Sequence, residues 1–344
     1  MEKIRVGIAG SGFMGRTNAE TVARYLSGAE LAAVVGGSRA PALAREYGVD
    51  CEASVEALAA RADIDAILIS TPHAQHAGHA VAAARGGKHI LLDKPMATTV
   101  EDCDRIIAAA REAKVKLMIM FGQRFRKCNV EAHRLIEEGA IGKVKMVQET
   151  ILAGGGLKAL PPWQSRPENL GPLVGHAVHN IDRIRWFTGA EVVSVSAQVQ
   201  RDAATGGEVS TMALLGLDNG AMATLWESWD IAAPPFPRSA SGAWVAGETG
   251  NLDLDAYGTL RMGRYGEWKV MAEQEPIDWK GRGMLSPVRM EAYRAQHQEF
   301  IDSIVAERQP AVTGEDGRAA VEVALAAYRS AAEGRTVHLG AWAA

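Results

Sequence analysis

The sequence has few cysteines and no long apolar run. Its 344 residues contain three cysteines, Cys51, Cys103 and Cys128, which lie far apart and form no C-x-x-C pair. This set excludes a disulfide scaffold and a cysteine-rich zinc site, and free thiols are typical of a reducing cytoplasm. No stretch of about 18 consecutive apolar residues is present, and the N-terminus leads directly into an apolar segment without a signal-peptide layout. We therefore expect a cytoplasmic protein without a membrane span.

A large excess of one charge is also missing. The chain has 37 Lys and Arg residues against 41 Asp and Glu residues, for a formal net charge of -4. This balance gives no sign of nucleic acid or an anionic membrane as partner, and it is compatible with a small polar substrate. With 47% hydrophobic and 23% charged residues, the composition is that of a globular protein. Because one domain usually has about 100–200 residues, two domains are expected.

Segments of strand and helix character alternate over the first third of the chain. Ile4–Ala9 is an apolar, β-branched run that ends at Gly10, as a buried strand does, and Thr98 or Thr99 can cap a helix that runs to Lys114. This alternation predicts right-handed β-α-β units and a parallel sheet, hence an α/β Rossmann domain over residues 1–122. The predicted strands span 4–9, 31–35, 66–69, 89–92 and 116–121, and the predicted helices span 13–26, 41–47, 76–85 and 98–114.

The pattern changes after residue 122. Strand-like segments then follow one another with few helices between them, and Asp218-Asn219-Gly220 is a strong hairpin signal. We expect a C-terminal α+β domain over residues 123–344 with a mainly antiparallel sheet, whose last helices can pack back on the first domain. The predicted strands span 143–152, 192–200, 209–217, 221–228, 242–246 and 267–271, and the predicted helices span 131–138, 176–187, 288–306 and 317–332.

A glycine-rich turn joins the first predicted strand to the first predicted helix. It reads Gly10-Ser11-Gly12-Phe13-Met14-Gly15, a G-x-G-x-x-G motif. The first glycine permits a tight turn, the second lets a pyrophosphate approach the backbone at the helix N-terminus, and the third allows close packing of helix on strand. Because the motif stands between a strand and a helix, it predicts a dinucleotide site rather than a merely structural turn.

The end of the second predicted strand bears on which dinucleotide binds. An acidic residue there would bind the ribose diol of NAD, but the sequence is Val35-Gly36-Gly37-Ser38-Arg39. The hydroxyl of Ser38 and the guanidinium of Arg39 suit the 2′-phosphate of NADP. NADP is therefore favoured over NAD, which stays possible. Alternatively, Arg39 is a solvated charge or stacks on adenine.

Two further segments follow predicted parallel strands, at the sheet edge where ligands bind. Asp93-Lys94-Pro95 contains a lysine that can hydrogen-bond a substrate hydroxyl, unless it is a plain surface lysine. Ser70-Thr71-Pro72 is followed by His73, His76 and His79. Their spacing also fits a metal site, but their position beside the cofactor crevice favours ordinary hydrogen bonding, and no metal is predicted.

Histidines also occur in the second predicted domain. His176, His179 and Asp182 are spaced by three residues on one predicted helix, so they can face one cleft. A histidine titrates near neutral pH and can accept a hydroxyl proton while a hydride leaves the carbon. A buried structural histidine is the alternative, whereas a metal pair lacks a third ligand of suitable spacing. The loop before this helix, with Trp163 and Arg166, is a candidate substrate-binding segment.

Together these segments resemble the Gfo/Idh/MocA oxidoreductase family over nearly the whole chain. The resemblance implies an N-terminal Rossmann domain and a C-terminal domain with a large open sheet. It also implies NAD(P)-linked oxidation or reduction of sugars, cyclitols and related polyols by a homodimer or homotetramer. The segments that carry it are 9–16, Ser70-Thr71-Pro72 with His76, 87–89 leading to Asp93-Lys94-Pro95, Arg124-Phe125, and 175–189.

The resemblance also implies roles for single residues. Lys94 matches the catalytic lysine of the family and His179 its catalytic histidine. The candidate substrate contacts are His176, Asp182, Trp163 and Arg166. The expected cofactor contacts outside the glycine turn are Ser38, Arg39, Ser70, Thr71, Pro72, His76, Asp93, Lys94 and Arg124.

The chain departs from the family pattern at four positions. Asp93 replaces a glutamate before the lysine, and Gly175 replaces an aspartate four residues before the catalytic histidine. Ala177 replaces a glycine, and Asn18 replaces a histidine that often follows the glycine turn. Because the usual set of lysine, aspartate and histidine is incomplete, either His176 takes over part of the polar role or the substrate differs.

Three functions are consistent with these residues. The first is an NAD(P)-dependent dehydrogenase or reductase of a sugar or polyol, with His179 as general acid or base and Lys94 polarising the oxygen. The second keeps the cofactor without net redox, because transient oxidation of a sugar carbon acidifies its neighbour and allows elimination of a leaving group. The third is a dinucleotide-binding regulator without turnover, against which the presence of Lys94 and His179 argues.

Overall fold

The computed structural model describes residues 3–164 and 166–340, which fall into two compact units. The first unit contains the chain up to Gly122 and the segment Asp278–Arg318. The second contains Gln123–Ile277 and the chain from Ala319 on. The chain therefore leaves the first unit after Gly122 and returns to it for 41 residues near the C-terminus.

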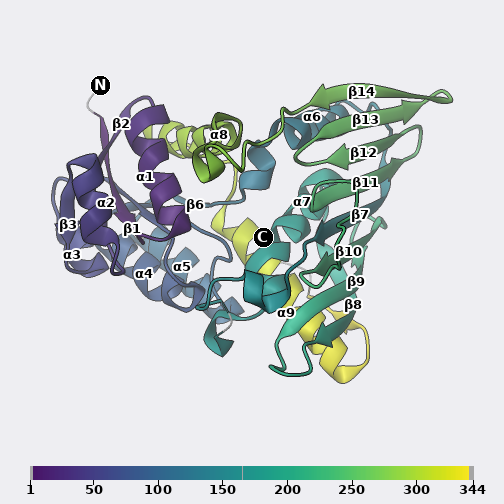
Figure 1. Cartoon of the computed structure of the whole chain (residues 1–344), viewed down its shortest axis with the longest axis horizontal. Helices are drawn as coiled ribbons and strands as arrows, with labels where there is room; N and C mark the ends of the chain where they lie inside the picture. The colour runs from purple at the N-terminus through teal and green to yellow at the C-terminus, as the bar shows by residue number, and fades with distance from the viewer. Residues whose placement is uncertain (1–2, 165, 341–344) are drawn as a thin grey trace. The chain divides into compact units, whose positions relative to one another are not determined.

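The first unit is built on a six-stranded parallel sheet with the strand order β3-β2-β1-β4-β5-β6 (Figure 1). β1 pairs with both β2 and β4, so the strand order reverses at β1. Ligands bind to such sheets outside the carboxyl ends of the strands at this reversal. The strands are β1 (Ile4–Ala9), β2 (Ala29–Val35), β3 (Asp50–Glu52), β4 (Ala66–Ile69), β5 (His89–Leu92) and β6 (Leu117–Ile119).

Helices connect these strands, and one helix from late in the chain joins them. The hydroxyl of Thr99 caps α5 by accepting the backbone N–H of Asp102 at 3.1 Å, as its spacing predicts. α8 packs against α1. β3 and α3 are absent from the predicted elements because each is too short for a periodic pattern. The helices are α1 (Phe13–Tyr25), α2 (Ala40–Tyr47), α3 (Val55–Ala60), α4 (His76–Arg85), α5 (Val100–Glu112) and α8 (Pro287–Val305).

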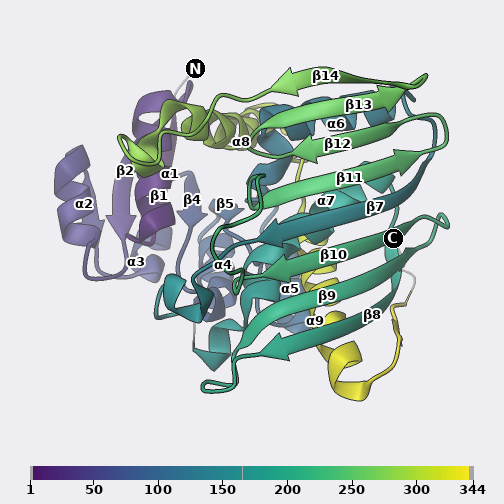
Figure 2. The same ribbon diagram turned by 45° about the vertical axis from the view of Figure 1, so that its right-hand side comes forward.

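The second unit is built on a nine-stranded sheet with the order β14-β13-β12-β11-β7-β10-β9-β8-β15 (Figure 2). β7 and β10 pair in parallel and the other neighbours are antiparallel, which confirms the predicted mainly antiparallel sheet. The strands are β7 (Val144–Leu152), β8 (Val192–Arg201), β9 (Glu208–Leu217), β10 (Met222–Ser228), β11 (Ser241–Gly247), β12 (Asn251–Asp255), β13 (Thr259–Arg264), β14 (Glu267–Glu273) and β15 (Val337–His338).

The two faces of this sheet differ. One face is packed against α6 (Lys127–Glu137) and α7 (Val178–Thr188), and α9 (Gly314–Glu333) is tied to β8 where Ser330 accepts the backbone N–H of Ala197 at 3.0 Å. The other face carries large apolar side chains that are 40–53% exposed. No helix among the described residues is long and apolar enough to cross a membrane. The exposed side chains are Met146, Met212, Leu214, Met222, Trp226 and Trp244.

Candidate functional site

The glycine turn lies at the carboxyl end of β1, beside the residue that follows β4. Gly10 has φ +116°, and a Cβ there would lie 2.5 Å from the carbonyl oxygen of Ser70. A Cβ on Gly15 would lie 2.0 Å from the carbonyl oxygen of Gly10, so only glycine lets α1 pack this closely on the strand. Gly12 is the N-cap of α1 and no side chain caps this helix, which leaves first-turn amides for a pyrophosphate. The turn fits a dinucleotide.

The segment after β2 folds back toward this turn. Gly36-Gly37 has positive φ at both residues, and the hydroxyl of Ser11 donates to the first of their carbonyl oxygens at 2.7 Å. The Nη2 of Arg39 lies 3.5 Å from the position that a Cβ on Gly12 would take. Ser38 and Arg39 are both exposed. The guanidinium is therefore held close to the turn yet open to a ligand.

α8 supports the glycine turn within the same unit. Arg289 is buried, and its guanidinium lies 4.9 Å from the ring centroid of Phe13. It donates to the hydroxyls of Thr17 at 3.3 Å and Tyr293 at 3.0 Å, and the hydroxyl of Tyr293 lies 3.9 Å from Sδ of Met14. These residues hold the first turn of α1. The sequence offers only one signal for them, an arginine on the buried side of a predicted helix.

His76 connects the loops that follow β4 and β5. The ring is fully buried, with Nδ1 2.8 Å from the carbonyl oxygen of Pro95 and Nε2 2.8 Å from that of Thr71. Burial lowers the pKa of His76. His79 lies with Nδ1 3.0 Å from the hydroxyl of Thr71. Within the two described ranges, no group of three or more His, Cys, Asp or Glu side chains is placed to hold a metal ion.

Asp93 and Lys94 follow β5 at the same sheet edge as the glycine turn. Asp93 is buried and accepts the backbone N–H of Lys94 at 2.9 Å. Burial raises the pKa of Asp93 to about 6, against the opposing effect of the charge on Lys94. Lys94 is half-buried and precedes a cis peptide bond to Pro95. The predicted lysine thus stands where a ligand of this sheet would bind.

A buried polar cluster lies behind this edge. Asn18 donates to the hydroxyl of Ser70 at 3.4 Å, and its side-chain oxygen lies 3.1 Å from Nε2 of His297 on α8. Burial lowers the pKa of His297 to about 4, so the neutral ring donates to Asn18 near neutral pH. Asn18 stands where a histidine often follows the glycine turn, and His297 of α8 places a histidine ring against it.

In the second unit, the helix that carries His179 is preceded by a π-helical turn. The π-helix spans Leu173–Ala177 and α7 begins at Val178, so the prediction of one α-helix from residue 176 was wrong at its start. His176 therefore lies in the π-helical turn and His179 in the first turn of α7. Glu208 is buried and accepts the first backbone N–H of the π-helix at 3.1 Å, which fixes where this turn begins.

His176 lies against an aromatic residue at the end of β10. Its ring centroid is 4.6 Å from that of Trp229, whose indole N–H donates to the buried Glu227 at 3.4 Å. Gly175 is buried, and its backbone N–H donates to the carbonyl oxygen of Gly171 at 2.9 Å. The sequence analysis did not single out Trp229 and Glu227, although an acidic residue near the end of a strand and an aromatic residue directly after it could have indicated them.

Asp182 and Arg124 form a two-point ion pair. Nε of Arg124 lies 2.8 Å from Oδ2 of Asp182, and Nη2 lies 2.6 Å from Oδ1. The Asp182 side chain is fully buried and that of Arg124 is 11% exposed. The guanidinium also lies 5.7 Å from the ring centroid of Trp186. The structure thus brings together Asp182, a predicted substrate contact, and Arg124, a predicted cofactor contact. The charge of each side chain balances that of the other.

A second buried pair fixes α7 on the sheet. Arg183 donates from Nε and Nη2 to the two carboxylate oxygens of Glu149 on β7, the first at 2.7 Å. Asn180 also donates to Glu149 at 2.9 Å. Both members of the pair are buried. Three residues that follow His179, namely Asn180, Asp182 and Arg183, are therefore held by buried partners, which sets the rotation of α7. His179 itself is half-buried.

The loop between β7 and the π-helix carries the other predicted substrate contacts. Trp163 is half-buried and Arg166 is exposed. The buried Asn169 donates to the carbonyl oxygen of Trp163 at 2.9 Å and so fixes this part of the loop.

Comparison with known proteins identifies the family. Residues 4–121 match the oxidoreductase family with an NAD-binding Rossmann fold, and residues 129–253 match the GFO/IDH/MocA C-terminal domain. An inositol 2-dehydrogenase of Rhizobium meliloti is 30% identical over 98% of this chain and 99% of its own length. The chain belongs to the Gfo/Idh/MocA oxidoreductase family. The first unit of this Gfo/Idh/MocA protein is accordingly an NAD(P)-binding Rossmann domain.

Two further relatives show the range of this Gfo/Idh/MocA neighbourhood. The crystal structure of aldose-aldose oxidoreductase from Caulobacter crescentus superposes with a TM-score of 0.82 at 27% identity, covering 98% of this chain and 100% of the other. A 2,7-anhydro-N-acetylneuraminate hydratase of Mediterraneibacter gnavus is 25% identical over 98% of this chain and 97% of its own length. Relatives of similar coverage thus have both redox and hydratase names.

Proposed function

We propose that this protein is an NADP-preferring dehydrogenase or reductase of a sugar, cyclitol or related polyol. The observation that carries the proposal is Lys94, half-buried at the carboxyl edge of an NAD(P)-binding Rossmann sheet. His179, on a helix held by two buried ion pairs, adds a group suited to proton transfer. The relative named inositol 2-dehydrogenase supports the substrate class.

Lys94 and His179 carry the proton chemistry in this proposal. When bound, the nicotinamide exchanges a hydride with the carbon that bears the hydroxyl. Lys94 donates a hydrogen bond to the substrate oxygen and stabilises the negative charge that develops there. His179 accepts the hydroxyl proton in the oxidative direction and returns it in the reductive direction. Asp182 acts through Arg124 as a positioning residue for α7.

The cofactor preference rests on Arg39. Its guanidinium is exposed, carries positive charge and lies next to Gly12, where the glycine turn receives the dinucleotide. A 2′-phosphate accepts charge-assisted hydrogen bonds from such a group, whereas a ribose diol does not need them. Ser38, directly before it, adds a hydroxyl donor.

Substrate selection is assigned to the second unit. His176 and Trp229 form an aromatic pair to which the apolar face of a sugar ring can pack, and Trp163 and Arg166 lie on the loop before the π-helix. Because Gly175 offers only backbone where the family has an aspartate, we assign to His176 the hydrogen bond that the aspartate would make.

A second candidate is elimination from a sugar through transient oxidation, without net redox. Two observations favour it: the missing aspartate at Gly175, and the relative named 2,7-anhydro-N-acetylneuraminate hydratase. In this version, loss of a hydride from one carbon to the cofactor would leave a carbonyl and acidify the adjacent C–H. Removal of that proton would form a carbon–carbon double bond and expel the leaving group from the next carbon. The hydride held by the cofactor would then return to the carbonyl carbon, so that no net redox results.

One experiment separates these functions. Sugars, cyclitols and polyols, some with glycosidic leaving groups, are each incubated with NAD and with NADP while the absorbance of the reduced nicotinamide and the products are followed. The main proposal expects stoichiometric NADPH and a carbonyl product from at least one compound. Sugar products without net NADPH would replace it with the second candidate. Tight cofactor binding without either product across the panel would contradict both and favour a regulator.

We also propose a homo-oligomer that forms through the open face of the nine-stranded sheet. Trp226 pairs across strands with Met212 and Met222 with Met146, which makes a continuous apolar area on neighbouring strands. Areas of this kind mark protein interfaces. Light scattering after size exclusion should give a dimer or larger for the native chain and a monomer for Trp226→Asp with Met212→Asp. A native monomer would contradict this proposal.

A further inference from the structure

Two buried side chains near the first turn of α6 have hydrogen-bond donors without an acceptor. Arg126 is 6% exposed, and no acceptor among the described residues is bonded to its Nε or Nη1. Gln274 is 8% exposed, and the same holds for its Nε2. All three unmatched atoms are donors, so the group that would satisfy them must be rich in acceptors.

The two side chains belong to one neighbourhood in the second unit. The guanidinium of Arg126 lies 4.0 Å from the ring centroid of Tyr257. Gly258 directly follows Tyr257 in the chain, and its carbonyl oxygen accepts the backbone N–H of Gln274 at 2.8 Å. The Cys128 thiol, in the first turn of α6, donates to the same oxygen at 3.3 Å. The loop between β12 and β13 therefore joins the start of α6 to the residue after β14.

The positive charge of Arg126 is buried and lies at the N-terminus of a helix, and both features are energetically unfavourable for an unpaired cation. A guanidinium keeps its charge in proteins, and burial of an unpaired charge is costly. Arg126 is also the N-cap of the 11-residue α6, which no side chain caps, and the helix dipole disfavours a cation at this end while it favours an anion. The contact with the Tyr257 ring offsets only part of this cost.

We propose that Arg126, Gln274 and the first-turn amides of α6 bind a small oxyanion, the carboxylate or phosphate group of a small molecule. Such a group accepts several hydrogen bonds at once, supplies the missing counter-charge and matches the positive end of the helix. The site involves neither Lys94 nor His179, so it is independent of the proposed function.

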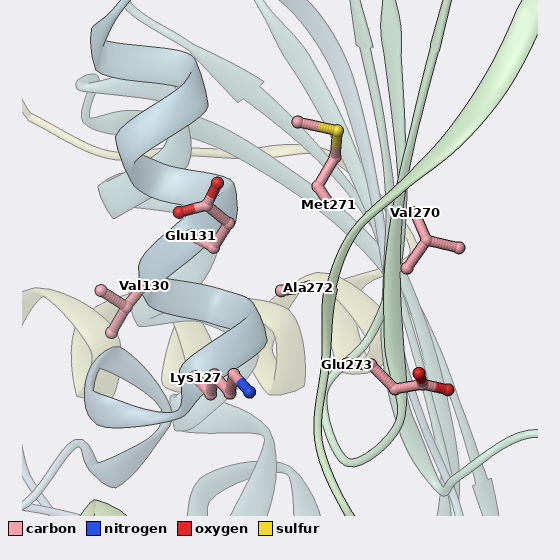
Figure 3. Close-up of a pocket in the computed structure, with 7 residues that line it drawn as sticks. All are labelled: Lys127, Val130, Glu131, Val270, Met271, Ala272 and Glu273. Atoms are coloured by element: carbon pink, nitrogen blue, oxygen red, sulfur yellow. The ribbon is translucent and has the colours of Figure 1, made fainter.

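A pocket is lined by Lys127 and Glu273, which are the chain neighbours of Arg126 and Gln274. It has a volume of about 680 Å³ and lies between α6 and β14. Figure 3 shows Lys127 and Glu131 on α6 and Glu273 on the strand across from them. Lys127 directly follows Arg126 in the chain and adds positive charge, while Glu131 is paired with Arg134 at 2.6 Å. Because Glu273 also lines the pocket, a small anion fits better than a large polyanion.

The test is a thermal melting experiment on the full chain. The midpoint is measured with inorganic phosphate or acetate, each against chloride at equal ionic strength. We expect a saturable rise of about 2 °C or more with at least one of the two. A lower half-saturation concentration for phosphate than for acetate would indicate a phosphate ligand, and the reverse order would indicate a carboxylate ligand. Equal midpoints in phosphate, acetate and chloride would overturn the proposal.

Variants assign the effect to the site. Arg126→Met should abolish the rise and leave the midpoint in chloride unchanged or higher, because it removes an unpaired buried charge. Gln274→Leu should raise the half-saturation concentration about fivefold or more. The matched control Arg134→Met, on the same helix, should keep the full rise. A rise that persists in Arg126→Met would overturn the proposal. Calorimetric titration of the native chain with the same anion, expected to show one site per chain, keeps the test independent of the folding of any variant.

Discussion

Arg124 and Asp182 hold each other through two parallel hydrogen bonds, at 2.8 and 2.6 Å. Asp182 lies on α7 three residues after His179, and Arg124 lies in the short 3-10 segment Gly122–Phe125. The pair therefore ties the helix of the proposed catalytic histidine to a different part of the second unit. Both side chains are almost enclosed, so each supplies a buried counter-charge to the other.

The first prediction concerns this pair. Asp182→Asn should lower the free energy of unfolding by about 3–5 kcal/mol, because it removes the buried carboxylate that is bonded to the Arg124 guanidinium. Urea denaturation measures the change. Glu191→Gln is the matched control, since it breaks the half-exposed pair of Arg185 on the same helix and should cost less than about 1 kcal/mol. Equal losses in the two variants would show that the Arg124–Asp182 pair has no special weight.

The second prediction is a pH dependence that comes from Asp93. Its pKa is raised from 3.8 to about 6 in the folded chain, so the folded state binds the proton more tightly than the unfolded state does. This contribution to stability is complete below pH 3.8 and is lost as the pH rises through 6, a change of about 3 kcal/mol. Asp93→Asn should therefore match the native chain near pH 4 and exceed its stability by about that amount at pH 7.5. Denaturation curves measure the difference in unfolding free energy between Asp93→Asn and the native chain at each pH. The same difference at both pH values would contradict this prediction.

The third prediction has the opposite sign and concerns His297. Its pKa is lowered from 6.5 to about 4, so the folded state binds the proton more weakly than the unfolded state. The stability that follows is present above pH 6.5 and is lost as the pH falls to 4, by about 3 kcal/mol. His297→Gln can still donate to Asn18 but does not titrate, so its unfolding free energy should lack this component of the acid loss. An identical acid profile for the variant would exclude His297 as its source.

The fourth prediction tests the cofactor preference. Arg39→Ala should raise the dissociation constant of NADP about tenfold or more, because a charge-assisted hydrogen bond is lost, and should change that of NAD by less than about twofold. Fluorescence titration of both cofactors measures this. Arg16→Ala removes another exposed arginine, paired with Glu46, and should affect neither. Equal weakening of NAD and NADP by Arg39→Ala would remove the argument for NADP.

Local rules were enough to predict the parts of the fold that depend on neighbouring residues. The glycine turn follows from the lack of room for a Cβ at Gly10 and Gly15, and the start of α5 follows from the hydroxyl of Thr99. β12 and β13 were missed although Leu252 and Leu254 alternate with polar residues, because each strand is short and polar on its open face.

Other features lie beyond such rules. The contact of Arg289 with Phe13 joins residues far apart in the chain, and no local periodicity encodes such a pairing. The π-helix Leu173–Ala177 was also missed, because the pattern of apolar residues was compared only with the α-helical repeat. His176 and His179 were named from the sequence, whereas the change of helix type between them was not.

The central claim is that Lys94 and His179 perform the proton chemistry of a cofactor-dependent reaction. It is tested most directly by turnover of Lys94→Ala and His179→Ala with NADP and the best polyol of the panel, together with the NADP dissociation constant of each variant. The account predicts a loss in turnover of about 10²–10⁴-fold in both variants, with cofactor affinity within about threefold of the native value. Turnover at the native rate in both variants would contradict it.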